Sequence, residues 1–157
     1  MERKCILAIR IRGEINSPRR IRDTLRMLRV DRNMTATLLD DRPEYLGMLQ
    51  KAKDYITWGE PNLDMVHLIL EKRGRLVGDH PINDDSLSSL GYEDIGALAK
   101  ALYDGDTEYH KLEGIKPFFR LHPPRKGFKR TVKRPYRSRG ELGYRGEAIN
   151  KLAKRMC

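Results

Sequence analysis

Apolar and polar positions alternate at the start of the chain, over residues 4–12. One face of this segment carries Cys5, Leu7, Ile9 and Ile11. The other face changes from apolar to basic at Arg10. A period of two residues is typical of a strand with at least one buried face. We therefore predict a first strand over residues 4–12.

A helix, a strand, a second helix and a third strand follow in the same pattern. Ser17 as N-cap and Pro18 as first helical residue predict the start of the first helix. Its apolar face contains Ile21, Leu25 and Leu28. We predict the next strand over residues 34–40, a helix starting near Pro43, and a strand over residues 55–60. This order predicts an α+β fold, a small open sheet with two helices on one face.

The pattern changes twice after the third strand. Two amphipathic helices are predicted, one from Asn62 to Gly74 and one over residues 94–103, with a loop and a short helical turn between them. Periodicity is weak beyond Glu113 and returns over residues 146–157. We predict a core (residues 1–60), a helical extension packed on it (61–113), and a basic arm ending in a short helix (114–157).

The charge of the chain is concentrated in two of its segments. The formal net charge is +10. Residues 1–34 carry 10 basic and 4 acidic side chains, residues 35–113 carry 8 and 16, and residues 114–157 carry 14 and 2. Basic segments of this kind are typical of proteins that bind a polyanion, because neutralised phosphates release their counterions. We expect the acidic middle segment to face away from that anion.

The basic arm is the first candidate RNA-binding segment. Its prolines exclude a continuous helix, and its aromatic side chains could stack on unpaired bases. The alternative is a disordered, solubilising tail. The candidate residues of this segment are Arg120, His122, Arg125, Lys126, Phe128, Lys129, Arg130, Lys133, Arg134, Tyr136, Arg137, Arg139, Tyr144 and Arg145.

The first strand and helix are the second candidate. Their basic residues are arginines, whose planar guanidinium matches two phosphate oxygens at once. The alternative is an ordinary solvated helix face. The candidate residues here are Arg10, Arg12, Ser17, Arg19, Arg20, Arg22, Arg26 and Arg29.

The sequence shows no catalytic, metal-binding or cofactor-binding motif. The four histidines, His67, His80, His110 and His122, are scattered along the chain. Two cysteines, Cys5 and Cys157, make neither a disulfide framework nor a metal half-site, and we interpret them as free thiols in a reducing cytoplasm. We expect no cofactor, no metal, no small-molecule substrate, no membrane association and no homo-oligomer.

Several stretches resemble the large-subunit ribosomal protein family numbered thirty. They are SPRRIRDTLRMLRV, DRPEYLGMLQKAKD and YITWGEPNL in the first 63 residues, and GIKPFFRLHPPRKGFKR and ELGYRGEAINKLAKRM near the end. The last two are similar to the longer archaeal and eukaryotic branch. The chain begins directly at its first strand, without the basic extension of eukaryotic members, which favours the archaeal form.

This resemblance implies a ferredoxin-like core with a three-stranded antiparallel sheet, decorated by added helices and an extended basic C-terminal arm. It implies a structural constituent of the large ribosomal subunit that stabilises rRNA folding and supports subunit assembly. The partners would be large-subunit rRNA, near the five-S rRNA, and neighbouring ribosomal proteins. The RNA-facing positions carried over by motif are Arg19, Arg20, Arg22, Arg26, Arg120, Arg125, Lys126 and Lys129.

Two other functions remain open at this stage. One is a free-standing RNA chaperone or DNA-binding protein. The other is a small ferredoxin-like enzyme of the acylphosphatase kind, against which the missing paired glycines and the basic arm argue. On the three-segment division, a chain shortened to residues 1–113 should fold and should lose most of its RNA affinity.

Overall fold

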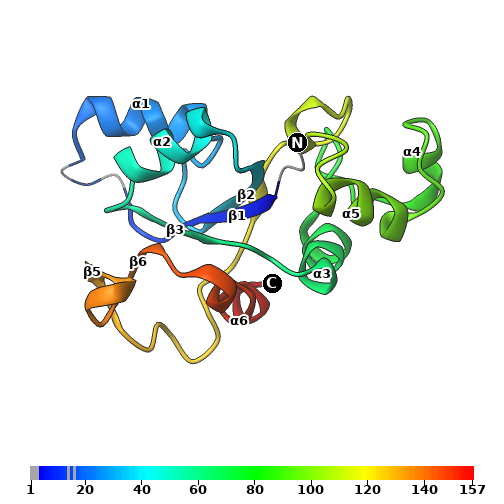
Figure 1. Cartoon of the computed structure of the whole chain (residues 1–157). Coiled ribbons are helices and arrows are strands. Elements are labelled where there is room, and N and C mark those ends of the chain that lie inside the picture. The colour runs from blue at the N-terminus through cyan, green and yellow to red at the C-terminus, as the bar shows by residue number, and fades with distance from the viewer. Residues whose placement is uncertain (1–3, 14, 16) are drawn as a thin grey trace.

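The computed structural model describes residues 4–13, 15 and 17–157, and its centre is a mixed sheet of six strands (Figure 1). The strands lie in the order β4-β2-β1-β3-β6-β5. Their bounds are β1 (Cys5–Arg10), β2 (Thr35–Asp40), β3 (Ile56–Gly59), β4 (Phe119–Arg120), β5 (Thr131–Pro135) and β6 (Gly140–Tyr144). The fold is α+β, as the sequence predicts.

The predicted three-stranded antiparallel sheet is only the centre of this larger sheet. Strand β1 pairs antiparallel with β2 and β3, and β2 pairs antiparallel with β4. Strand β6 pairs parallel with β3 and with β5. The expectation of three strands is therefore wrong. The added strands come from the segment predicted as an extended arm. A basic segment can form strands because the hydrogen bonds of a sheet join main-chain groups, whatever the charge of the side chains.

Two helices cover one face of the sheet. They are α1 (Arg19–Met27) and α2 (Pro43–Lys51). They enclose a core cluster with Ile6 and Ala8 of β1 and Trp58 of β3. Helix α1 begins after Pro18, with Pro18 rather than Ser17 in the cap position, so the predicted serine cap is wrong.

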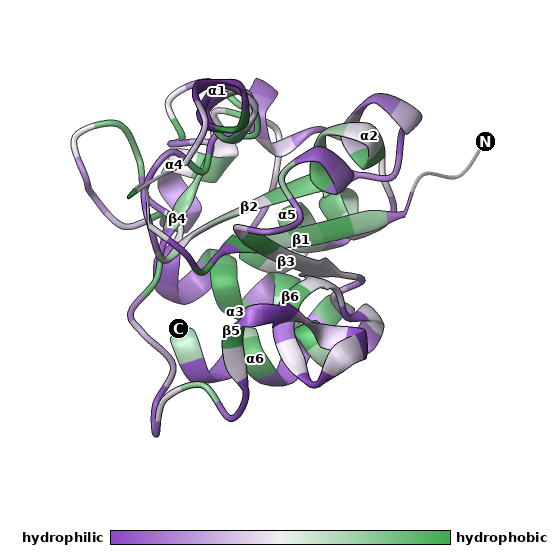
Figure 2. Ribbon diagram, turned by 90° about the vertical axis from the view of Figure 1, so that its left-hand side faces the viewer, coloured by the Kyte–Doolittle hydropathy of each residue, from purple (hydrophilic) through white to green (hydrophobic). Residues whose placement is uncertain are grey.

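The opposite face is also covered, contrary to the prediction of a single helical layer. Its helices are α3 (Leu63–Arg73), α4 (Asp84–Ser88), α5 (Ile95–Tyr103) and α6 (Ile149–Met156), with 3₁₀ turns at Tyr109–Lys111, Tyr136–Ser138 and Gly146–Ala148. Leu7 and Ile9 of β1 point into this larger cluster. Figure 2 shows apolar residues on β1 and on the helices beside it. Both faces of β1 are therefore buried.

The local signals for the later helices agree with the structure. Asn62 caps α3 by accepting a hydrogen bond from the Met65 main chain (2.8 Å), and Gly74 follows its last residue. Asp94 caps α5 in the same way through Ala97 (2.8 Å). The short helical turn predicted between them is α4. Both cysteines are free and buried, and burial is the main cause that raises the pKa of Cys5 to about 12.

The larger core cluster contains residues from all three predicted segments. Ile9, Ile69 and Leu152 all belong to it, and each is at most 3% exposed. The predicted division into residues 1–60, 61–113 and 114–157 therefore stays a prediction from the composition of the sequence. Because the three segments share one core cluster, we no longer expect a chain without the third segment to fold.

We predict that a chain shortened to residues 1–113 fails to fold, because it would leave the α6 side of the cluster open to water. The variant Leu152→Ala should lower the free energy of unfolding by about 2–5 kcal/mol, measured by urea denaturation. Its matched control is Lys151→Ala on the exposed side of α6, which should change it by less than about 0.5 kcal/mol. A cooperatively folded 1–113 fragment would contradict this prediction.

Candidate nucleic-acid interface

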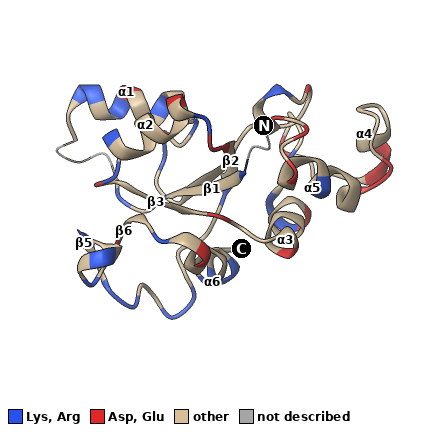
Figure 3. Ribbon diagram, viewed as in Figure 1, with Lys and Arg blue, Asp and Glu red and all other residues tan. Residues whose placement is uncertain are grey.

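Helix α1 presents a row of exposed arginines at the surface. Its inner side is formed by Thr24 and Leu25, which are buried. Helical periodicity then places the basic residues on the outer side. Figure 3 colours the basic positions along α1 blue. The exposed arginines of this helix are Arg19, Arg20, Arg22 and Arg26, while Arg29 after the helix is half-buried.

Arg10 and Arg12 have contacts within the protein. Arg10 is 1% exposed, and its guanidinium donates to the carbonyl oxygens of Arg12 (Nε, 2.8 Å) and Val30 (Nη1, 3.0 Å). Arg12 donates to the Asp54 carbonyl oxygen (3.1 Å), and its guanidinium lies 5.3 Å from the centre of the Tyr55 ring. Arg10 therefore holds the end of β1 to the loop after α1, and we leave it out of the interface proposed below.

Residues 125–139, here called the basic segment, form the second exposed group of cations. Strand β5 lies in this segment at the edge of the sheet, and the 3₁₀ turn at Tyr136–Ser138 leads into β6. At the turn, Arg139 has a φ of 65°, and a Cβ on Gly140 would overlap the carbonyl oxygen of Arg134. The exposed basic residues are Arg125, Lys126, Lys129, Arg130, Lys133, Arg134, Arg137 and Arg139.

A buried ion pair anchors the basic segment to β6. Arg145 Nη2 lies 2.7 Å from Glu141 Oε2, and the two side chains are 5% and 6% exposed. Arg145 Nε donates to Thr57 Oγ1 (2.7 Å), which itself donates to the Gly143 carbonyl oxygen (2.7 Å). The other carboxylate oxygen of Glu141 accepts from the Arg130 main chain (3.0 Å). The pair thus joins β3, β6 and the start of β5.

Glu141 was not among the residues singled out from the sequence. Its signal was available, since it is one of only two acids after residue 113 and lies four residues before Arg145. Arg145 was predicted to contact RNA. Its burial assigns it to the support of the basic segment instead, and we leave it out of the interface proposed below.

The aromatic residues of the candidate interface differ in exposure. The Tyr136 ring has two guanidinium groups near it, Arg130 at 5.1 Å and Arg145 at 5.0 Å from its centre. Phe128 is half-buried and packs against the larger core cluster. Tyr144 is 41% exposed and donates from its hydroxyl to the Glu60 carboxylate (2.8 Å), a bond that raises the pKa of the tyrosine. Tyr144 is therefore the aromatic residue best placed to meet an unpaired base.

Tyr144 lines a groove of about 520 Å³ between α2 and the basic segment. Leu46, Trp58 and Tyr136 supply apolar lining. The charged lining consists of the cations Lys4, Lys53 and Arg137 and the acids Asp41 and Glu60. A groove with an aromatic wall and cations is suited to single-stranded nucleic acid.

Arg120 and His122 lie before the basic segment, at and after β4. Arg120 is exposed. His122 is half-buried, with Nδ1 2.7 Å from the Pro123 carbonyl oxygen and Nε2 2.9 Å from the Cys157 main-chain oxygen. The histidine therefore joins the end of β4 to the end of α6. Ser17 is half-buried just before α1.

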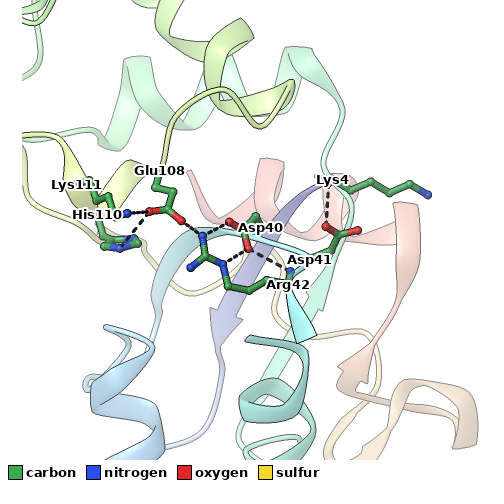
Figure 4. Close-up of polar contacts among 7 residues, drawn as sticks. All are labelled: Lys4, Asp40, Asp41, Arg42, Glu108, His110 and Lys111. Atoms are coloured by element: carbon green, nitrogen blue, oxygen red, sulfur yellow. Dashed lines mark hydrogen bonds and ion pairs between the residues drawn. The ribbon is translucent and has the colours of Figure 1, made fainter. Parts of the chain in front are cut away.

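Acidic side chains lie mainly on another part of the molecule, around α3, α4 and the loop after α5 (Figure 3). There Arg42 binds the Asp40 carboxylate through two nitrogens (both 2.8 Å) and also pairs with Glu108 (Figure 4). Lys111 binds the second oxygen of Glu108 (2.7 Å). This network ties the chain before β4 to β2 and α2, and it balances its own charges.

The described part of the chain offers no group of three or more histidine, cysteine or acidic side chains suited to a metal ion. Within the same residues, no helix is long and apolar enough to cross a membrane.

Comparison with known proteins identifies close relatives along the whole chain. A family model described as ribosomal protein L30p/L7e matches residues 6–56. Large ribosomal subunit protein uL30 of Staphylothermus marinus is 51% identical over 94% of this chain and 95% of its own length. The protein of that name from Methanopyrus kandleri is 48% identical over 93% and 99%. The one from Ignicoccus hospitalis is 47% identical over 99% of both chains.

We predict that the Glu141–Arg145 pair is needed for the stability of the sheet edge. Glu141→Ala leaves a buried guanidinium without its carboxylate, which should cost about 3–5 kcal/mol of unfolding free energy, measured by chemical denaturation. The matched control Glu147→Ala removes an exposed acid nearby and should cost less than about 0.5 kcal/mol. Equal effects of the two substitutions would show that the pair contributes nothing specific.

Proposed function

Since the chain belongs to the ribosomal protein L30p/L7e family, as an archaeal-type uL30, we propose that it binds rRNA through the exposed arginines of α1 and the cations of the basic segment. Membership makes it a structural constituent of the large ribosomal subunit and not an enzyme. In that setting it binds rRNA and other ribosomal proteins. The enzyme alternative is thereby dropped.

The exposure of these two groups of cations carries the proposal. Four arginines of α1 and eight cations of the basic segment are exposed, while the acids lie mainly elsewhere. Such a separation directs one side of the protein toward a polyanion. We infer that the contact residues are Arg12, Ser17, Arg19, Arg20, Arg22, Arg26, Arg29, Arg120, His122, Arg125, Lys126, Phe128, Lys129, Arg130, Lys133, Arg134, Tyr136, Arg137, Arg139 and Tyr144.

The mechanism is counterion release combined with positioning. Guanidinium groups bind phosphate oxygens in pairs, and Tyr144 can stack on a base that has left its helix. Strand β5 is hydrogen-bonded to β6 at Thr131 and Pro135, and the Arg130 main chain is bound by Glu141. A segment held in this way loses less conformational entropy on binding than a disordered tail would.

Family membership also replaces the alternative of a free-standing RNA chaperone. Co-sedimentation checks this, since a structural constituent should leave the large subunit only at high salt.

We further propose that the interface lies near the five-S rRNA. The support for this is the resemblance of the two C-terminal motifs to the archaeal and eukaryotic branch of the family.

We predict a steep salt dependence of binding to large-subunit rRNA. For about ten phosphate contacts, the logarithm of the binding constant should fall with the logarithm of the salt concentration at a slope of about −7 to −9. The double variant Arg19→Gln/Arg22→Gln should make the slope less negative by about 2. Filter binding over a salt series measures both.

The control for this measurement is Lys100→Gln on α5, an exposed cation on the acidic side of the molecule. It removes one charge without touching the proposed interface and should leave the slope unchanged. A wild-type slope near −2 would rule out the extended phosphate interface.

The position near the five-S rRNA can be tested by directed hydroxyl-radical cleavage. An iron chelate attached to Ser138→Cys, in the exposed turn after β5, should cleave five-S rRNA in assembled subunits. The same chelate on Ser88→Cys of α4 is the control and should leave five-S rRNA intact. Cleavage of large rRNA alone from position 138 would reject this position while leaving the interface in place.

A further inference from the structure

A second basic pocket lies at the end of α3. Of its cations only Arg120 is among the contact residues proposed above. It has a volume of about 170 Å³ and is lined by Arg73, Arg75, Asp79, Lys116, Phe118 and Arg120. Four of these side chains are basic and one is acidic. Arg73 and Arg75 come from the segment of net negative charge, so a count of charge along the sequence hides them.

The main chain brings these cations together. Arg73 is the last residue of α3, and Arg75 follows the Gly74 cap. The Lys116 main chain donates to the Arg75 carbonyl oxygen (2.9 Å), and Leu76 pairs with Ile115 in a short antiparallel bridge. Backbone hydrogen bonds thus hold side chains of like charge close together. The repulsion between these charges raises the free energy of the folded protein.

Two of the cations are oriented within the pocket. Arg75 Nη1 donates to the carbonyl oxygens of Gly74 (2.8 Å) and Lys72 (3.2 Å). Lys116 Nζ lies 3.3 Å from Asp79 Oδ1. This hydrogen bond is the first cause that lowers the pKa of Asp79, and the charges of Arg120 and Arg75 lower it further.

One carboxylate does not balance the pocket. Asp79 pairs with Lys116, which leaves three guanidinium groups without a carboxylate partner in the lining. The side chains of Arg73 and Arg120 make no hydrogen bond or ion pair with another residue of the described chain. An anion that enters the pocket would relieve the repulsion and accept hydrogen bonds from several donors at once.

We propose that Arg73, Arg75, Lys116 and Arg120 form a second phosphate-binding site that contacts the RNA backbone. The proposal rests on the RNA-binding function proposed above. Arginine at three of the four positions fits the paired oxygens of a phosphate. An acidic peptide would present carboxylates instead, but this chain belongs to a family whose members are built into rRNA, and Phe118 adds an aromatic surface beside the cations.

The pocket and the basic segment lie at opposite edges of the sheet, which matters for assembly with RNA. Arg120 lies in β4 and the basic segment contains β5, the two opposite edge strands of the sheet. Five inter-strand steps separate them, about 24 Å at a spacing of about 4.8 Å. The protein therefore holds RNA backbone at both edges of its sheet and fixes the distance between the two contacts.

Charge-neutralising variants test the site by the salt dependence of binding to large-subunit rRNA. Arg73→Gln should make the slope less negative by about 1, and Arg73→Gln/Arg120→Gln by about 2. Lys100→Gln is the matched control and should leave the slope unchanged. Circular dichroism checks that each variant keeps its fold, which we expect because neither arginine side chain has a hydrogen bond within the described chain.

The outcomes separate this site from the interface on α1. An unchanged slope for the Arg73 and Arg120 variants, with a reduced slope for Arg19→Gln/Arg22→Gln, would overturn the second site alone. Unchanged slopes for all of them would overturn the RNA interface as well.

Directed cleavage gives an independent measurement. Val77 is 70% exposed on the loop that follows Arg75. An iron chelate on Val77→Cys should cleave rRNA in assembled subunits, at nucleotides different from those cleaved from Ser138→Cys. Cleavage from position 138 only, or cleavage of a protein neighbour from position 77 in place of RNA, would overturn the second site.

Discussion

Strand β1 is apolar on both of its faces, and the rest of the structure follows from the need to cover both. A strand with one apolar face can lie at the surface of a protein, but Ile6 and Ala8 on one side and Leu7 and Ile9 on the other cannot all avoid water with one layer of helices. Helices α1 and α2 cover the first face. The second face needs α3 and α6, which lie far apart in the sequence, so the last helix must pack against the first strand.

This requirement also positions the cations. Between β4 and α6 the chain crosses from one edge of the sheet to the other, and this crossing includes β5, the 3₁₀ turn and β6. The basic residues between Arg125 and Arg139 are carried on this crossing. The buried pair of Glu141 and Arg145 then ties the crossing to β3 through Thr57. The same part of the chain thus brings α6 to the core and places the basic residues at the surface.

The acidic middle segment has a role within the protein as well as a charge. Through Arg42, Glu108 of the loop after α5 is joined to Asp40 at the end of β2, in a network that balances its own charges. The pocket at Arg73 and Arg75 differs, because its cations exceed its one carboxylate. The net charge of the whole segment therefore does not distinguish the balanced network at Arg42 from the pocket at Arg73, where cations are in excess.

The sequence by itself determined the local elements and the class of partner. Period-two alternation identified β1, helical periodicity identified α3 and α5, and the excess of arginine indicated a polyanion. Each of these signals depends on neighbours a few residues apart. Only the tertiary structure decided that β6 joins the sheet, that Arg10 and Arg145 are buried, and that Arg73 and Arg75 meet Lys116 and Arg120. Those outcomes depend on contacts between residues about 20 to 90 positions apart, from Arg10 with Val30 to Arg145 with Thr57. No local pattern of side chains encodes which distant main chain a strand will pair with.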